Sequence, residues 1–334
     1  MEPTLPIVDA HHHLYGAMTD SHYYRRSDLA DDIARGHRII GTVYVEGYRS
    51  GWRETGSEAL RPVGEVEVTA RVTEAGLQTH FGACRVGAAI VSHADLTLGE
   101  DVSQVLEAQQ EAAQGRLRGV RQVAAHDGGV VGSFVKHPPQ RHLLMDPAFR
   151  RGFAELRRRE LSFDAWIFHH QLEELLDLAD AFPETPIVLN HVGGAIGVAE
   201  FQSQRTAVLA RWRKDLGRLA LRSNVLVKIG GLGMPLFGFG FEHAERPATS
   251  IELARAWQPF IDGSVEAFGP NRCMFESNFP VDKQSCGYVE LWNAFKLATQ
   301  TLSHEERREM FYRTACRTYD LPDLVEIGDL VDIA

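Results

Sequence analysis

Three consecutive histidines, His11, His12 and His13, stand near the start of the chain, directly after the apolar stretch PIVDA (6–10). In an extended segment, residues two positions apart project to the same side. The imidazoles of His11 and His13 can therefore reach one divalent cation, while His12 points into the wall behind them. Neutral imidazole is a common ligand of zinc, so this stretch is interpreted as one half of an active-site cluster, with or without a metal.

Titratable or amide side chains also follow the other short apolar runs of the chain. They are Glu46, His93, Asp95, Arg121, His169, His170, Gln171, His191, Lys228, Glu276, Asn278 and Asp282. A single histidine beside an apolar run is usually a buried structural residue, and Asp95 or Asp282 could equally cap the following helix. The recurrence of such residues after every run instead predicts one shared functional site.

The apolar runs that position these residues are interpreted as eight strands. The predicted strands are 6–10, 41–46, 87–93, 117–123, 161–168, 186–191, 224–230 and 273–277. Segments with helical spacing lie between them, such as 171–182, and a capping box formed by Ser303 and Glu306 begins another at 303–319. Alternating strands and helices without a linker favour a single (β/α)8 barrel over residues 1–334. Functional residues of such barrels gather at the C-terminal ends of the strands.

Composition excludes several other classes of protein. The net charge of −10 comes from mixed acidic and basic residues, which argues against a nucleic-acid partner. No stretch approaches a membrane span, and MEPTLPIVDA lacks the pattern of a secretory signal. The four scattered cysteines form no CxxC pair. We expect a cytoplasmic protein that acts on a small molecule, with a homo-oligomer left open.

Three segments in this order resemble the amidohydrolase superfamily: DAHHH (9–13), LNHVGG (189–194) and RCMFESNFPVDK (272–283). More narrowly, the chain resembles the amidohydrolase-related TIM-barrel branch, which includes lactonases and decarboxylases of aromatic acids. The resemblance implies one divalent metal ion, zinc or manganese, held by His11, His13 and a histidine after the fifth strand. We favour His169 over His170 for that third ligand. His191 would orient or polarise the scissile carbonyl.

Asn278 departs from the family pattern, in which this position is normally an aspartate that binds the metal and accepts the proton of the attacking water. A neutral amide cannot act as a general base. Glu276 lies two residues earlier on the same face and could take over this role, and so could Asp282. Alternatively, the chemistry is independent of a metal, or the site is catalytically silent.

The remaining candidates suit the substrate. Lys228 either polarises a carbonyl together with His191 or lies outward beneath a helix. Arg121 suits bidentate recognition of a carboxylate, or equally a salt bridge to a neighbouring strand. Two long loops, 47–67 and 230–247, are expected to wall the site, the second with an apolar surface for a ring-shaped substrate. The further expected substrate contacts are Glu46, His93, His170 and Gln171.

The expected reaction is hydrolysis of a small cyclic ester, a lactone. The resemblance points to a branch rich in lactonases, and the weakened strand-eight ligand suits a reactive ester better than an amide. Metal-dependent, non-oxidative decarboxylation of an aromatic acid is the alternative reaction. A catalytically silent barrel that acts as a binding protein is the third hypothesis, and Asn278 is its only support.

Overall fold

The computed structural model describes residues 2–15, 23–47 and 49–330. Eight parallel strands form a nearly closed barrel and pair in chain order. These strands are β1 (Ile7–His12), β2 (Ile39–Val45), β4 (Gly82–Ser92), β5 (Leu117–Val120), β6 (Ser162–Ala165), β7 (Ile187–Leu189), β8 (Val225–Ile229) and β9 (Cys273–Phe275). The predicted (β/α)8 barrel is confirmed, with a strand inside or overlapping each of the eight predicted runs.

The barrel closes beyond the end of its last strand. After β9 the chain runs alongside β1, where Asn278 N donates to His11 O and His13 N donates to Phe279 O, both at 2.8 Å. Asp9 supports this seam, because its Oδ1 accepts from Ser277 N at 2.8 Å. The seam brings the histidine stretch beside the segment that carries Glu276 and Asn278.

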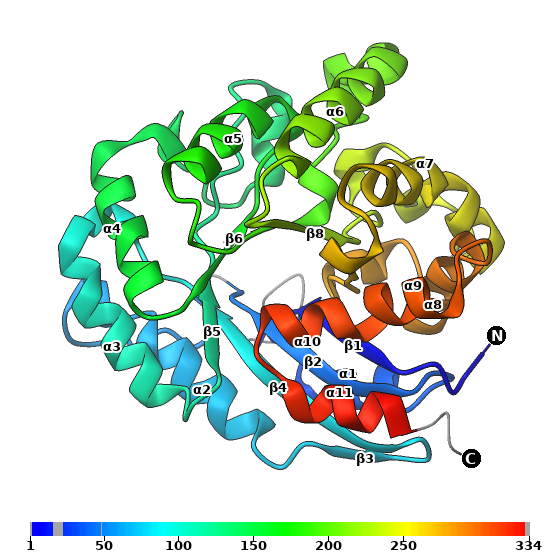
Figure 1. Cartoon of the computed structure of the whole chain (residues 1–334), viewed down its shortest axis with the longest axis horizontal. Coiled ribbons are helices and arrows are strands. Elements are labelled where there is room, and N and C mark those ends of the chain that lie inside the picture. Colours follow the sequence, from blue (N-terminus) through cyan, green and yellow to red (C-terminus); the bar gives the residue numbers. More distant parts are fainter. Residues whose placement is uncertain (1, 16–22, 48, 331–334) are drawn as a thin grey trace.

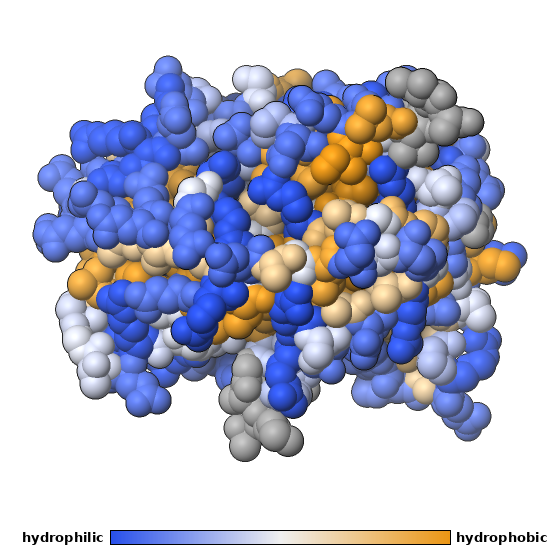
Figure 2. All heavy atoms as spheres, turned by 90° about the horizontal axis from the view of Figure 1, so that it is seen from below, coloured by the Kyte–Doolittle hydropathy of each residue, from blue (hydrophilic) through white to orange (hydrophobic). Residues whose placement is uncertain are grey.

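The outer layer consists of helices that surround the strands (Figure 1). Its helices are α1 (Arg26–Ile33), α2 (Val63–Thr73), α3 (Val102–Ala112), α4 (Pro147–Arg158), α5 (Leu172–Ala181), α6 (Arg205–Ala220), α7 (Ser250–Phe268) and α8 (Tyr288–Ala298). The helix predicted at 171–182 is confirmed as α5, whose leucine face is buried. No helix in the described ranges is both long and apolar enough to cross a bilayer. Hydrophilic side chains cover most of the face seen in Figure 2, around a narrower hydrophobic zone.

The C-terminal segment packs against the first strands (Figure 1). The predicted capping box at Ser303 is confirmed and begins α9 (His304–Arg308), but a π-helical turn (Glu309–Arg313) separates it from α10 (Thr314–Thr318). The last helix, α11 (Pro322–Asp329), lies so close to β2 that Gly41 has no room for a Cβ beside Leu324. This segment thereby covers strands whose other ends carry the polar residues.

Some predicted boundaries were wrong. A short strand, β3 (Leu77–Thr79), pairs antiparallel with the start of β4 and was not predicted. The loop expected at 47–67 ends earlier, because α2 begins at Val63. The fourth and fifth predicted strands, 117–123 and 161–168, end early, at Val120 and Ala165, so the polar residues that follow lie in irregular segments and not on strands.

Candidate active site

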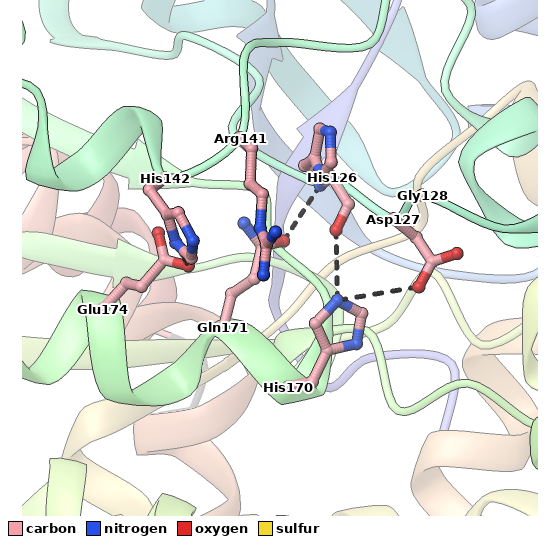
Figure 3. Close-up of a pocket in the computed structure, with 8 residues that line it drawn as sticks. All are labelled: His126, Asp127, Gly128, Arg141, His142, His170, Gln171 and Glu174. Atoms are coloured by element: carbon pink, nitrogen blue, oxygen red, sulfur yellow. Dashed lines mark hydrogen bonds and ion pairs between the residues drawn. The ribbon is translucent and has the colours of Figure 1, made fainter.

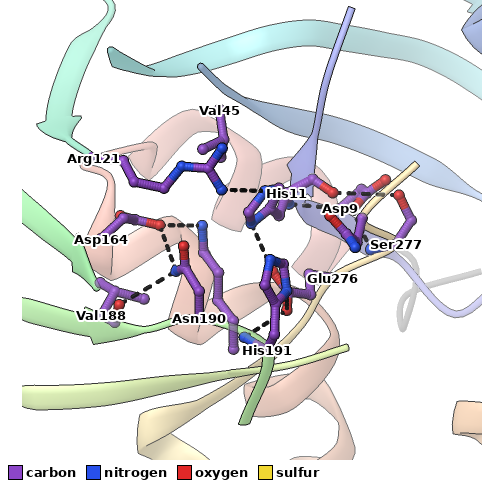
Figure 4. Close-up of polar contacts among 12 residues, drawn as sticks. Asp9, His11, Val45, Arg121, Asp164, Val188, Asn190, His191, Glu276 and Ser277 are labelled. Carbon is purple, nitrogen blue, oxygen red and sulfur yellow. Dashed lines mark hydrogen bonds and ion pairs between the residues drawn. The ribbon is translucent and has the colours of Figure 1, made fainter. Parts of the chain in front are cut away.

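The centre of the site is the carboxylate of Glu276, which follows β9 and has no exposed surface. Its Oε1 accepts hydrogen bonds from His191 Nδ1 at 2.7 Å and from His191 N at 3.1 Å (Figure 4). Its Oε2 lies 2.8 Å from Nδ1 of His11. Ligand atoms of these three residues all lie within 4.8 Å of one another. Residues that follow or end β1, β7 and β9 thus meet at one point.

The histidine stretch alternates as its spacing predicts. His11 and His13 face the same side, with their Nε2 atoms 3.1 Å apart, and His13 Nδ1 lies 2.9 Å from Val45 O. His12 turns into the wall, where its Nε2 lies 2.8 Å from Thr42 Oγ1. Burial is the main cause that holds the pKa of His11 and of His13 well below the ordinary value, so both rings are neutral.

The Glu276 cluster, defined as His11, His191 and Glu276, fits a divalent cation. His11 Nδ1 and Glu276 Oε2 are buried and close, yet they are not aligned as a hydrogen bond and neither has another hydrogen-bond partner among the described residues. Two imidazoles and one carboxylate are a common ligand set of catalytic zinc sites, and imidazole and carboxylate also bind manganese. The two unsatisfied atoms are therefore placed as ligands would be.

This set differs from the expected ligands His11, His13 and His169. His13 stands behind His11 and is not in the cluster. His169 also lies outside it: its Nδ1 accepts from Ile196 N at 3.4 Å, its ring packs on Phe201, and burial lowers its pKa to about 4. The reason for the difference is that 169–171 forms a 3-10 turn and does not continue the strand.

The two other candidates for the base, Asn278 and Asp282, are bound to each other. Asn278 Nδ2 donates to Asp282 Oδ1, and Gly233 N donates to Asp282 Oδ2, both at 2.8 Å. Burial raises the pKa of Asp282 well above its ordinary value. Both oxygens of Asp282 are therefore engaged in holding loops, whereas Glu276 keeps an oxygen without a hydrogen bond.

Arg121 and Glu46 form a buried ion pair in the wall of the site. Arg121 Nε donates to Glu46 Oε1 and its Nη2 donates to Glu46 O, both at 2.7 Å. Its Nη1 lies 3.3 Å from His11 Nε2. The fork that we expected to bind a substrate carboxylate is therefore occupied by Glu46, and its charge is directed toward His11.

Lys228 is also paired. Its Nζ donates to Asp164 Oδ2 at 2.6 Å, and Asp164 accepts two further hydrogen bonds, from Asn190 Nδ2 at 2.9 Å and from Tyr319 OH at 3.0 Å. The charge of Lys228 is a second cause, after burial, of the low pKa of His11. Lys228 thus influences the cluster through its charge while its ammonium group is held by Asp164.

The remaining expected substrate contacts lie around the cluster. Gln171 is fixed to the main chain, because its Oε1 accepts from His126 N and its Nε2 donates to Ala124 O, both at 2.9 Å. His170 Nε2 lies 3.0 Å from His126 O. His93 is buried with its ring centroid 5.4 Å from that of Trp52.

Sequence reasoning missed Trp166, whose ring centroid lies 4.8 Å from that of His191. The signal was present, since Trp166 lies inside the predicted strand 161–168, but its apolar character marked it as core. Trp166 forms an aromatic wall of the cluster on the β6 side.

The loop 230–247 contacts the site through its glycines. Gly231, which has a positive φ, leaves no room for a Cβ beside His191. The phenylalanines expected to face the substrate turn elsewhere, because Phe237 and Phe239 pack on Phe260 of α7, with ring centroids 5.6 and 6.1 Å apart. The aromatic part of this loop therefore anchors it to the outer helices.

The chain is similar to known proteins over most of its length. A sequence profile described as amidohydrolase matches residues 8–321. The chain is 30% identical over 237 residues to an L-fucono-1,5-lactonase from Burkholderia multivorans, covering 71% of this chain and 72% of that protein.

Solved structures share the fold. An amidohydrolase from Burkholderia multivorans with bound zinc has a TM-score of 0.68 at 24% identity, covering 95% of this chain and 99% of that one. A 5-carboxyvanillate decarboxylase from Novosphingobium aromaticivorans, complexed with manganese and 4-hydroxy-3-methoxy-5-nitrobenzoic acid, has a TM-score of 0.60 at 12% identity, covering 96% and 97%. The profile match spans nearly the whole barrel, and the chain belongs to the amidohydrolase family.

Proposed function

We propose that this protein hydrolyses a small lactone at the Glu276 cluster, with Glu276 as the general base. The observation that carries the proposal is the Oε2 atom of Glu276, which is buried beside His11 without a hydrogen bond among the described residues. A carboxylate in this state can accept a proton from a bound water. The similarity to an L-fucono-1,5-lactonase supports a cyclic ester as substrate.

His191 positions the base. Its ring and main-chain nitrogens both donate to Oε1, at 2.7 and 3.1 Å, which fixes the carboxylate so that Oε2 remains for water. The water gives one proton to Oε2 as its oxygen bonds to the lactone carbonyl carbon. Arg121 places a positive charge beside His11, where the carbonyl oxygen becomes negative. The ring C–O bond then breaks, and Glu276 returns the proton to the departing alkoxide, which yields a hydroxy acid.

The three residues of the cluster would hold a zinc or manganese ion, and His11 would bind it through Nδ1. His11 Nε2 would then donate a hydrogen bond to Nε2 of His13. When bound, such an ion lowers the pKa of water and polarises a carbonyl. The geometry of Glu276, His191 and Arg121 serves the same reaction in either case, because it fixes the base and the charge.

The test is hydrolysis of a panel of five- and six-membered lactones, measured by acid release, with wild-type protein and two variants. Glu276→Gln should lower kcat roughly 100- to 10,000-fold, the usual contribution of a general base. Asp282→Asn, which changes the other candidate carboxylate, should lower it less than about tenfold. Circular dichroism confirms that each variant is folded.

Two outcomes would overturn the proposal. A Glu276→Gln protein within a few-fold of wild type would exclude Glu276 as the base. Release of carbon dioxide from aromatic acids, with no lactone opened, would assign the decarboxylase reaction instead. Elemental analysis of protein purified without chelator reports separately on the metal: about one zinc or manganese per chain that is lost in His11→Ala would assign the cluster as its site.

A further inference from the structure

A cavity of about 440 Å³ lies between the loop after β5 and the start of α5 (Figure 3). Its size is within the range of roughly 300–1,000 Å³ typical of small-molecule pockets. None of its lining residues belongs to the Glu276 cluster. They are His126, Asp127, Gly128, Arg141, His142, His170, Gln171 and Glu174.

The acidic residues of the cavity wall lie beside histidines, whereas its arginine forms no ion pair with a described acidic residue. Glu174 Oε1 lies 2.8 Å from His142 Nδ1, and Asp127 Oδ2 lies 3.8 Å from His170 Nε2, so each carboxylate already faces an imidazole. Arg141 has no hydrogen-bond or ion-pair partner among the described residues. Figure 3 shows its guanidinium extending between His142 and His170. The cavity therefore offers one guanidinium whose donors are not engaged by any described residue.

The wall around Arg141 is held in place by the main chain. His126 N donates to Gln171 Oε1 at 2.9 Å, and His126 O lies 3.0 Å from His170 Nε2. The imidazole of His126 has no partner of its own in the part of the chain that the structure describes. A wall fixed by its backbone with free polar groups at its surface is preorganised, which lowers the entropy cost of binding.

We propose that this cavity binds a small carboxylate, with the guanidinium of Arg141 as its bidentate anchor and the imidazole of His126 as a further contact. Arginine presents a planar pair of donors that matches the two oxygens of a carboxylate. The sequence predicts Arg121 as the residue that binds a carboxylate, but the guanidinium of Arg121 already donates two hydrogen bonds to Glu46. Arg141 carries the same guanidinium group, and its N–H donors are available to a ligand.

A chain of contacts links the cavity to the Glu276 cluster. Gln171 Nε2 donates to Ala124 O, Ala124 N donates to Trp166 O at 3.0 Å, and the Trp166 ring packs on His191. The carboxylate could accordingly belong to one end of the molecule that reacts at the cluster or to a separate ligand. Both sources require the same contact with Arg141, and the proposal does not depend on the lactone reaction.

The experiment is calorimetric titration with citrate, and separately with inorganic phosphate, of wild-type protein and two variants. Arg141→Gln should weaken citrate binding roughly 10- to 100-fold, which corresponds to one charge-assisted contact. Arg35→Gln is the matched control, because Arg35 is an exposed arginine between α1 and β2 and the change in net charge is identical. Citrate affinity in this control should equal that of wild type.

Three results would overturn the proposal: no citrate binding by wild type, equal weakening in both variants, or binding of phosphate without citrate. His126→Ala gives a second test, with weakening expected while the fold is unchanged. If citrate competes with substrate in the wild-type reaction, the carboxylate is an end of the reacting molecule. If citrate binds through Arg141 without competing, the ligand is separate. Both of these results support the site.

Discussion

Two carboxylates, Asp164 and Glu276, are completely buried in the same barrel, but their surroundings differ. Asp164 accepts hydrogen bonds from Lys228, Asn190 and Tyr319, which occupy both of its oxygens and include an ammonium group at 2.6 Å. Glu276 has one oxygen bound by His191 and one without a hydrogen bond. The first carboxylate is saturated, and the second is not.

This difference in hydrogen bonding distinguishes a buried carboxylate that stabilises the fold from one that is available for catalysis. A buried acceptor without a hydrogen bond costs about 1–3 kcal/mol of folding free energy. Most buried polar groups are hydrogen-bonded, and each exception needs an explanation, such as a bound water, an ion or a catalytic role. Burial alone would mark both carboxylates as functional candidates, whereas the state of their lone pairs selects Glu276.

The strongest test of this comparison is to remove the cation that pairs with Asp164 and, separately, the charge of Glu276. Lys228→Met leaves Asp164 as a buried charge without its cation, which should lower the free energy of unfolding by about 3–5 kcal/mol. Glu276→Gln removes the charge of the unsaturated carboxylate, so its cost should stay below about 1 kcal/mol. Urea unfolding at neutral pH measures both.

A double variant controls for the loss of the lysine stem. Lys228→Met combined with Asp164→Leu removes both charges and should recover part of the loss, because neither partner is then left unpaired. Equal costs for Lys228→Met and Glu276→Gln would contradict the distinction between the two carboxylates.

The pH dependence of stability tests a buried histidine, His37, whose two ring nitrogens both have hydrogen-bond partners. His37 is buried, with Nδ1 2.9 Å from Lys296 Nζ and Nε2 3.2 Å from Val289 O. Burial, followed by the charge of Lys296, lowers the pKa of His37 to about 4. The unfolded chain binds this proton near pH 6.5, so it binds more protons than the folded chain between these values. Stability from this group is therefore complete above about pH 6.5 and is lost as the pH falls toward 4.

The expected loss from His37 over that interval is about 2–3 kcal/mol. His37→Gln should flatten the fall in unfolding free energy between pH 7 and pH 4.5, measured by urea unfolding at each pH. His80→Gln, a change at an exposed histidine between β3 and β4, is the matched control and should leave the slope unchanged. An unchanged slope in His37→Gln would show that this ring is not held neutral.

Much of the barrel and the centre of the site could be predicted from the sequence. The existence of each barrel strand is recognisable from a short apolar run, and alternation by two places His11 and His13 on one side and His12 on the other. These inferences succeed because they depend on backbone periodicity, which adjacent residues determine.

The pairings between distant side chains could not be predicted. Glu46 forms an ion pair with Arg121, which is 75 residues away in the sequence, and Asp164 forms one with Lys228, which is 64 residues away. His169 was assigned to a strand end, but the chain has already turned there. Whether a charged side chain is available for catalysis depends on which side chains lie beside it in the folded structure. A local sequence pattern does not contain that information.

The smallest expected effect concerns Tyr319, which reaches the saturated carboxylate from the C-terminal segment. Its hydroxyl donates to Asp164 at 3.0 Å, and its ring lies 5.1 Å from Lys228 Nζ. Tyr319→Phe keeps the ring and removes one of three hydrogen bonds to a charged acceptor, so it should cost about 1.5 kcal/mol in urea unfolding. Tyr319→Leu also removes the ring from Lys228 and should cost more. If the Phe variant lost lactone-opening activity while retaining its stability, Asp164 would belong with Glu276 as a chemical group, and the distinction between the two carboxylates would fail.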